Sequence, residues 1–207
     1  MILLVREDRE FLCSPGAEVH TDLGVLEVPE SVSPGDIVES HLGEPFRVRS
    51  LRGPDLFDHL ERTGAPMIPK DIGLLVGHSG VSADDRILDA GTGTGVLAAY
   101  LGRMGATVRT YEVNEEFADV ARRNMAVASV TENVTVVTGD VLEDVEDLRG
   151  FDLLTLDTED APAVVEHAPE TLVSGGFIAV YSPFVESART VQETATDVGL
   201  EAVEQHL

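Results

Sequence analysis

The stretch RILDAGTGTG at residues 86–95 is the strongest indication of the fold, because an apolar strand runs directly into a glycine-rich turn. A helix-forming run begins at Val96, immediately after the last glycine. Glycines at such a junction let the backbone come close to a ligand, and the start of the following helix presents free N–H groups. A strand, a glycine-rich turn and a helix in this order are typical of a nucleotide-binding turn.

Strands and helices alternate around this turn. Segments with apolar residues at helical spacing are separated by short apolar strands, which is the pattern of a parallel sheet with helices on both faces. We therefore predict a Rossmann-like α/β fold. The expected strands are residues 86–89, 107–113, 134–137, 151–156 and 177–181, with the start of a sixth at 200–203, and the expected helices are residues 71–79, 96–104, 115–128 and 185–198.

The first 55 residues follow a different pattern. Short apolar stretches are separated by turn signals, such as the Ser-Pro-Gly sequences at residues 14–16 and 33–35. This pattern predicts a small β domain over residues 1–55, a connector over 56–68 and the main domain over 69–207. The strands expected in the β domain are residues 2–5, 25–28, 37–38 and 46–48.

The chain is strongly acidic, with 38 acidic and 14 basic residues and a net charge of -24. Lys70 is the only lysine. Such a surface suits molar salt, where the Debye length shrinks to about 3 Å and repulsion between carboxylates is screened. We therefore expect a halophilic protein. The charge weakens the case for a nucleic-acid partner without removing it, because phosphate contacts in concentrated salt gain little from counterion release.

Several classes of protein are disfavoured by simple counts. One cysteine, Cys13, excludes an internal disulfide and a cysteine-based zinc site, and the six histidines lack metal-ligand spacing, so we predict no metal. No apolar run reaches the ~20 residues that a membrane span needs. The apolar stretch at residues 1–5 is too short for a signal peptide. We expect a cytoplasmic protein that does not bind membranes.

Three acidic residues follow successive strands after the glycine-rich turn. Glu112 ends the second strand, Asp140 follows the third and Asp157 follows the fourth. Because the carboxyl ends of parallel strands meet at one edge of a sheet, we expect these acids to border one crevice. A carboxylate in the position of Glu112 can accept hydrogen bonds from both hydroxyls of a ribose.

The glycine spacing narrows the type of cofactor. Dinucleotide-binding proteins usually have G-x-G-x-x-G, whereas this chain has G-x-G-x-G with Asp89 two residues before the first glycine. This variant resembles motif I of class I methyltransferases, which implies S-adenosylmethionine as the cofactor. In that pattern Asp89 helps to position the methionine ammonium and Asp140 contacts the adenine amino group. The predicted cofactor site comprises Asp89, Gly91, Thr92, Gly93, Thr94, Gly95, Glu112 and Asp140.

Three segments together look like the archaeal and bacterial tRNA (adenine-N1)-methyltransferase family. They are IPKDIG at residues 68–73, DAGTGTG at 89–95 and GFIAVYSP at 176–183. That family has a small N-terminal β domain before the methyltransferase fold and is typically tetrameric. The resemblance implies methylation of N1 of an adenine in the T-loop region of tRNA, with the target base flipped out of its stack.

The same resemblance assigns the catalytic residue. Asp157 matches the acid that the family carries after its fourth strand, which holds the amino group of the target adenine and promotes attack by N1. The family continues beyond the position of Leu207 with a final antiparallel hairpin, so we expect the sheet of this chain to lack its last strands. We expect tRNA and further copies of this chain as partners.

Other functions remain open at this stage. A methyltransferase that acts on isoaspartyl residues or on a small molecule would carry the same cofactor residues. A non-catalytic, RNA-binding subunit would keep the fold without turnover, although Asp157 and the other strand-end acids argue against it. An NAD-dependent dehydrogenase conflicts with the glycine spacing and with the lack of an evident catalytic His or Tyr–Lys pair.

Overall fold

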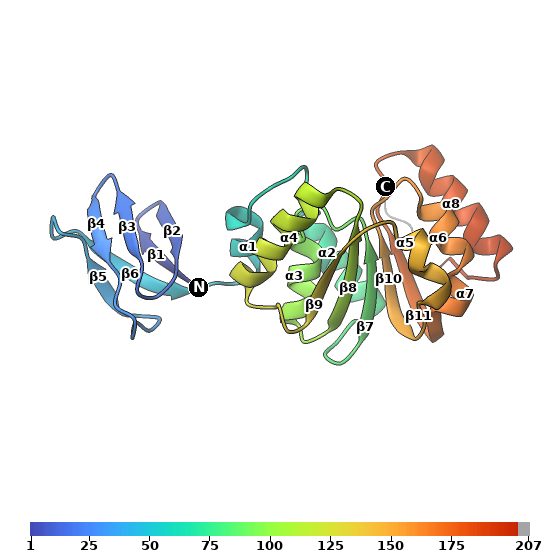
Figure 1. The fold of residues 1–207 in the computed structure, drawn as a ribbon, viewed down its shortest axis with the longest axis horizontal. Helices are drawn as coiled ribbons and strands as arrows, with labels where there is room; N and C mark the ends of the chain where they lie inside the picture. The colour runs from blue at the N-terminus through green and yellow to red at the C-terminus, as the bar shows by residue number, and fades with distance from the viewer. Residues whose placement is uncertain (203–207) are drawn as a thin grey trace. The chain divides into compact units, whose positions relative to one another are not determined.

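The computed structural model describes residues 1–202, and the chain forms two compact units (Figure 1). The first unit comprises Met1–His59, and the second begins at Leu60. The first unit is largely antiparallel β structure, as the turn-rich sequence predicts. The second is a parallel α/β sheet, so the predicted fold class is confirmed.

The first unit contains six strands and one short helix. A four-stranded antiparallel sheet has the order β2-β1-β6-β5, and β3 and β4 form a separate hairpin. The elements are β1 (Ile2–Arg6), β2 (Arg9–Cys13), β3 (Glu18–Thr21), β4 (Gly24–Glu27), β5 (Ile37–Glu39), β6 (Pro45–Ser50) and α1 (Gly53–His59).

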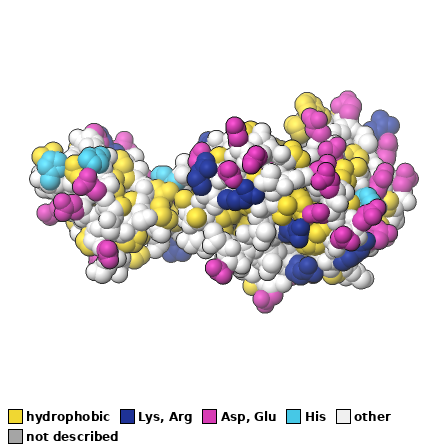
Figure 2. All heavy atoms as spheres, viewed as in Figure 1, with side chains coloured by type: hydrophobic (Ala, Val, Ile, Leu, Met, Phe, Trp, Pro, Cys, Tyr) yellow, Lys and Arg dark blue, Asp and Glu magenta, His cyan; other side chains and the backbone are white. Residues whose placement is uncertain are grey.

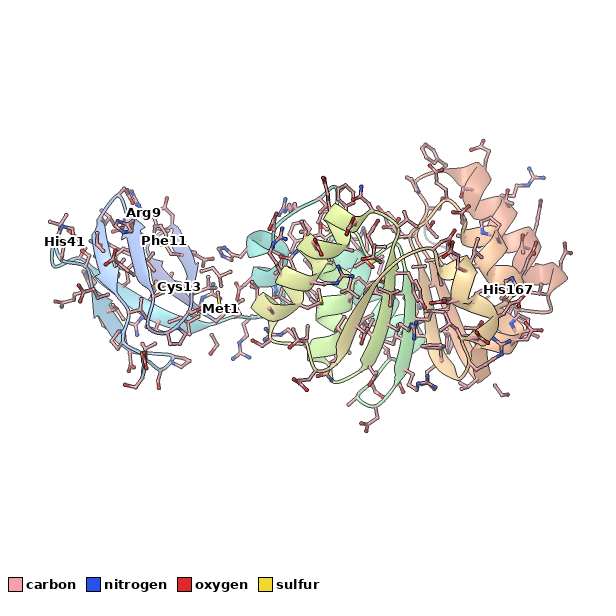
Figure 3. The ribbon with its side chains drawn as sticks, viewed as in Figure 1. Met1, Arg9, Phe11, Cys13, His41 and His167 are labelled. Carbon is pink, nitrogen blue, oxygen red and sulfur yellow. The ribbon has the colours of Figure 1, made fainter. Side chains whose placement is uncertain are left out.

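This unit has its own core, in which Leu4, Leu26 and Phe46 are fully buried. Phe11 of β2 packs edge-on against Phe46, with ring centroids 5.9 Å apart, and Cys13 lies on the same strand (Figure 3). The sequence pattern misses β2 and β3, because β2 (REFLC) has an apolar run of only three residues and β3 (EVHT) has a single apolar residue. Pairing with a neighbouring strand, rather than local apolar composition, defines these two strands.

The second unit has a five-stranded sheet in the order β11-β10-β7-β8-β9, and every neighbouring pair is parallel. Its strands are β7 (Arg86–Ala90), β8 (Thr107–Glu112), β9 (Val134–Thr138), β10 (Phe151–Leu156) and β11 (Leu172–Val180). Its helices are α2 (Pro69–Ser79), α3 (Val96–Arg103), α4 (Glu115–Ala128), α5 (Val141–Asp144), the 3₁₀ helix η1 (Val145–Asp147), α6 (Ala161–Glu166), α7 (Ala168–Thr171) and α8 (Val185–Asp197).

Helices cover the faces of this sheet, and the alternation of side chains along each strand explains how. Leu88 and Leu154 lie in one buried cluster with side chains of α6 and α8. Since successive residues of a strand point to opposite faces, Ile87 and Leu153 are buried on the other face. Helices α3 and α4 pack against β8 and β9 (Figure 1).

Most predicted elements of the second unit are present within one or two residues of their predicted ends. Strand β11 is longer than expected and includes Gly175 and Gly176, which lie where its register against β10 shifts. The sixth strand predicted at residues 200–203 is not seen at 200–202, and Val203 lies outside the described residues. The short helices α5, α6 and α7 were not predicted, because runs of four to six residues carry too little periodicity.

Acidic side chains are spread over the visible surface of both units and outnumber the basic ones (Figure 2). This distribution agrees with the even spacing of Asp and Glu along the chain. Among the helices of residues 1–202, none has both the length and the apolar character that crossing a membrane requires.

Candidate active site

The strand order places the candidate site at the carboxyl end of β7. This strand lies between β8, which follows it in the chain, and β10, which comes later. In open α/β sheets, ligands bind where the strand order reverses in this way. The carboxyl ends of β7, β8 and β10 carry Asp89, Glu112 and Asp157 respectively, so the structure brings these three predicted residues to one edge.

The glycine-rich turn is folded tightly between its two neighbouring strands. The N–H groups of Gly91 and Thr92 both donate to the carbonyl oxygen of Tyr111, at 3.0 and 3.1 Å. Gly91 has φ +97°, and a Cβ there would collide with the backbone carbonyl of Asp157. Only glycine fits this position, because it tolerates the left-handed conformation and leaves room for the β10 backbone.

Gly93, at the middle of the turn, is not crowded by neighbouring atoms as Gly91 is. It also has a positive φ of +51°, yet a Cβ at this position would have no atom of residues 1–202 within 4 Å beyond its chain neighbours. The turn is therefore open on this side, and a ligand can approach its backbone closely. The predicted role of Gly93 in cofactor binding is compatible with this opening and remains a prediction.

Asp89 lies beneath the turn in a buried row of polar side chains. Parallel register aligns Thr155, Asp89 and Thr110 on three adjacent strands. The Thr110 hydroxyl donates to Oδ2 of Asp89 at 2.6 Å, and the Thr155 hydroxyl donates to Oδ1 at 2.5 Å. Since the proton of the Thr110 hydroxyl is used in this way, Thr92 donates to Thr110 across 2.5 Å. The turn is thereby linked to Asp89.

Burial is the main influence on Asp89. It raises the pKa of the carboxyl above its ordinary value, the two threonine hydroxyls oppose this rise, and the charge of Glu112 adds to it. The predicted role beside the methionine ammonium remains a prediction. In the structure, both oxygens of Asp89 already accept hydrogen bonds from the protein and hold the turn in place.

Glu112 is buried at the end of β8 and joins the turn to the next helix. One carboxylate oxygen accepts from the N–H of Gly93 at 2.9 Å, and the other accepts from the N–H of Asn114 at 3.0 Å. The Asn114 side chain in turn caps α4 by accepting from the N–H of Glu116 and Phe117. Each Glu112 oxygen keeps a second lone pair, so the predicted hydrogen bonds from ribose hydroxyls are compatible with this geometry.

Asp140 follows β9 and caps the short helix α5. Its Oδ1 accepts from the N–H of Leu142 at 2.9 Å. This is an ordinary N-cap interaction, and it fixes the side chain through one oxygen. Within residues 1–202, no hydrogen bond involves the other oxygen, so the predicted contact with an adenine amino group stays compatible with the structure.

Asp157 differs from the other acids because its side chain is exposed. Its backbone is fixed, since its N–H donates to the carbonyl of Ala90 at 2.9 Å. Within residues 1–202, its carboxylate makes no hydrogen bond. Although water reaches the carboxylate, surrounding protein desolvates it and the nearby Asp89 repels it, which together raise its pKa to about 6. Raised carboxyl pKa values are frequent at functional sites.

Three further residues of the site escaped the sequence analysis: Thr110, Thr155 and Asn124. The two threonines carry a simple signal, because each lies two residues before a strand-end acid and so points to the same face. Asn124 is buried in α4, where it interrupts an apolar stripe that includes Ala121, Met125 and Ala128. A polar residue on such a stripe indicates a buried hydrogen-bonding role.

Three histidines make their contacts within the first unit. His20 contacts Glu18, His59 contacts Glu10, and His41 accepts from the N–H of Val25. Figure 3 labels His41 in the first unit and His167, which follows α6. Among residues 1–202, no three acidic, histidine or cysteine side chains are placed to hold a metal ion. A shallow hollow lined by Asp85, Asp152 and Phe177 lies at the amino-terminal edge of the sheet.

Two relatives cover most of the chain. It is 29% identical over 229 residues to TrmI of Methanocaldococcus jannaschii, a tRNA (adenine(57)-N(1)/adenine(58)-N(1))-methyltransferase, with 96% of this chain and 80% of that protein covered. It is also 29% identical over 190 residues to a TrmI of Thermus thermophilus, a tRNA (adenine(58)-N(1))-methyltransferase, with 88% and 74% covered.

The fold agrees with a solved methyltransferase structure. An S-adenosylmethionine-dependent O-methyltransferase of Thermotoga maritima superposes with a TM-score of 0.77 at 28% identity, covering 95% of this chain and 76% of the other. Residues 57–205 match the sequence profile of the tRNA methyltransferase complex GCD14 subunit. The predictions of a Rossmann-like fold and of S-adenosylmethionine-dependent methyl transfer are confirmed. This chain belongs to the family of the tRNA methyltransferase complex GCD14 subunit.

Proposed function

We propose that the chain transfers a methyl group from S-adenosylmethionine to N1 of an adenine in the T-loop region of tRNA. The observation that carries the proposal is the Asp157 carboxylate, which has no hydrogen-bond partner within residues 1–202 and follows the strand next to the glycine-rich turn. Membership of the family supports the class of reaction. The two TrmI relatives support the choice of tRNA adenine N1.

The residues of the turn are suited to hold the cofactor. S-adenosylmethionine supplies an electrophilic methyl group on a positively charged sulfur. The open backbone at Gly93 gives room for close approach, and Glu112 offers lone pairs to ribose hydroxyls. The second oxygen of Asp140 is available for the adenine amino group of the cofactor. We propose the full set Asp89, Gly91, Thr92, Gly93, Thr94, Gly95, Glu112 and Asp140 as the cofactor site.

Asp157 would act on the target base. Its carboxylate can accept a hydrogen bond from the exocyclic amino group of adenine and so orient N1 toward the methyl group. Methylation at N1 places a positive charge on the ring, and a carboxylate in a partly desolvated site stabilises this charge as it develops. Because the pKa of Asp157 is about 6, the group is ionised at neutral pH, as this role requires.

The proposal extends to assembly and to conditions. We propose that the protein works in the cytoplasm of a salt-adapted cell, as a homo-oligomer that is tetrameric by family resemblance. The net charge of -24 and the single lysine support the salt adaptation.

Raising KCl from 0.1 to 2 M should raise the melting midpoint by roughly 5 °C, or about 2 kcal/mol. A midpoint that falls with KCl would contradict it, and light scattering in 2 M KCl tests the oligomeric state.

The central experiment is transfer of labelled methyl groups in molar KCl. Unmodified tRNA and an isoaspartyl peptide are offered side by side, and a modified adenine is mapped by reverse-transcription stops. We expect label on one tRNA adenine and none on the peptide. Label on the peptide would instead assign the protein to the isoaspartyl class. Cofactor binding without transfer to either would support the non-catalytic alternative.

A further inference from the structure

The buried amide of Asn124 joins two segments that are distant in sequence. From helix α4, its Nδ2 donates to the carbonyl of Glu61 at 2.9 Å and to the carbonyl of Thr94 at 2.8 Å. Its Oδ1 accepts from the N–H of Glu61 at 3.1 Å. Both amide protons and the amide oxygen are therefore used, and the side chain is only 2% exposed. One of its partners, Thr94, belongs to the glycine-rich turn.

A second contact supports the same connection. The N–H of Thr63 donates to the Thr94 hydroxyl at 3.2 Å, and the two threonine hydroxyls lie 3.3 Å apart. Residues 61–63 are thus held against the turn at Thr94 in two ways: through the Asn124 side chain, and through direct contacts between Thr63 and Thr94. From Thr63, which contacts Thr94 of the turn, the chain continues to α2 at Pro69.

We propose that Asn124 is a positioning residue for the cofactor site, which fixes residues 61–63 against the glycine-rich turn so that the chain up to Pro69 borders the bound cofactor. This inference rests on the proposed function, because it takes S-adenosylmethionine as the ligand of the turn. Asn124 does not itself contact the turn's open side at Gly93. It acts through the carbonyl of Thr94 and through the backbone of Glu61.

The chemistry of the amide explains why asparagine is required here. Alanine would leave the Glu61 N–H and two carbonyls without their partner in a buried place, where an unmade hydrogen bond is costly. Aspartate would keep an acceptor for the Glu61 N–H but would place an oxygen against two carbonyl oxygens. Neither alanine nor aspartate can bond both the backbone of Glu61 and the carbonyl of Thr94, so residues 61–63 would move away from the turn.

The neighbouring Arg123 gives a matched control. Its guanidinium also contacts this segment, with two hydrogen bonds to the Glu61 carboxylate at 3.0 Å and one at 3.3 Å. Both side chains are more than half exposed, and exposed ion pairs contribute little. Arg123→Ala therefore removes a contact to the same residue from the same helix without touching the buried amide.

The test measures cofactor affinity by calorimetry on the full chain in molar KCl. We expect S-adenosylmethionine to bind at least about tenfold more weakly to Asn124→Ala, because residues 61–63 are no longer fixed against the turn before the cofactor binds. Arg123→Ala should change affinity by less than about twofold. Val120→Ala, a core change on the same helix, should lower the melting midpoint without weakening binding. Equal affinity of Asn124→Ala and the wild type would overturn the inference, and so would a loss matched by Val120→Ala.

A milder variant covers the case in which Asn124→Ala does not fold. Thr63→Val removes only the hydroxyl contact to Thr94 and should weaken binding about threefold, with non-additive effects when combined with Asn124→Ala. Hydrogen exchange at the Glu61 and Thr63 amides should quicken in Asn124→Ala even without cofactor, and unchanged exchange would overturn the inference. A wild-type chain that binds no S-adenosylmethionine would instead remove the proposed function, and this role with it.

Discussion

The two halves of the candidate site differ in how far their carboxylates are buried and hydrogen-bonded by the protein. On the β7–β8 side, Asp89 and Glu112 are buried, and every one of their oxygens accepts a hydrogen bond from the protein. On the β10–β11 side, Asp157 is exposed, and its carboxylate has no hydrogen bond within residues 1–202. The first half is built to hold the shape of a turn, whereas the second leaves an anionic group available to a substrate.

The backbone joins these halves closely. Ala90 accepts from the N–H of Asp157, and Gly91 lies against the Asp157 carbonyl. The backbone of Asp157 is therefore fixed relative to the turn, while its carboxylate oxygens make no hydrogen bond within residues 1–202. Under the proposed function, binding and chemistry are divided between the two sides, so substitutions on them should have separable effects.

The largest effect should come from Asp157→Asn. We expect kcat to fall by about 10³, within the range typical of a lost acid–base or electrostatic group, while S-adenosylmethionine affinity changes less than about twofold. The raised pKa means that ionised Asp157 is disfavoured in the folded state, so the change should not lower stability at pH 7. Methyl-transfer assays and calorimetry measure these two quantities. Retained turnover would remove Asp157 from the mechanism.

A change on the other side should act on the fold and on binding together. Gly91→Ala should destabilise the protein by about 3 kcal/mol, since it combines an unfavourable positive φ with a collision against the β10 backbone. Gly93→Ala should cost only about 1 kcal/mol, because its Cβ meets no other atom of residues 1–202 within 4 Å. Urea denaturation compares the two variants, and similar losses would contradict the close contact between Gly91 and Asp157.

The pH dependence of kcat/KM tests whether ionised Asp157 is required. If ionised Asp157 is required, kcat/KM should fall about tenfold per pH unit below about 6 and level off above it. The sign follows because protonation removes the acceptor for the adenine amino group. For stability, the raised pKa works in the other direction: the contribution of this group decreases as pH rises from 3.8 to about 6. A flat rate profile between pH 5 and 7 would argue against the role.

The smallest predicted effect tests the electrostatic link between the halves. Burial is the main cause of the raised pKa of Asp157, and the charge of Asp89 is the second. Asp89→Asn removes that charge, so the acidic limb of the rate profile should move to a pH below 6 while staying above the ordinary carboxyl range. Asp144→Asn, which alters a contact with Tyr111 elsewhere, should leave the limb in place. An unshifted limb in Asp89→Asn would show that the two carboxylates titrate independently.

The local features of this protein follow from its amino-acid sequence alone. The glycine spacing, the acids at strand ends and the periodicity of the longer segments predicted the parallel α/β fold and most element limits, as β10 and α4 illustrate. These features depend on residues close together in the chain, where backbone geometry and side-chain alternation act directly. The family resemblance then pointed to the reaction class.

The pairing of side chains in hydrogen bonds depends instead on tertiary contacts. Strand order brings Thr155, Asp89 and Thr110 into one row, although 21 and 66 residues separate the bonded pairs. The same is true of Asn124, which meets Glu61 across 63 residues and Thr94 across 30. Such partners are determined by packing and register between distant segments, so local sequence can indicate that a side chain forms a buried hydrogen bond but not with which partner. The residues packed around a strand-end acid therefore determine whether its carboxylate is hydrogen-bonded by the protein or remains accessible.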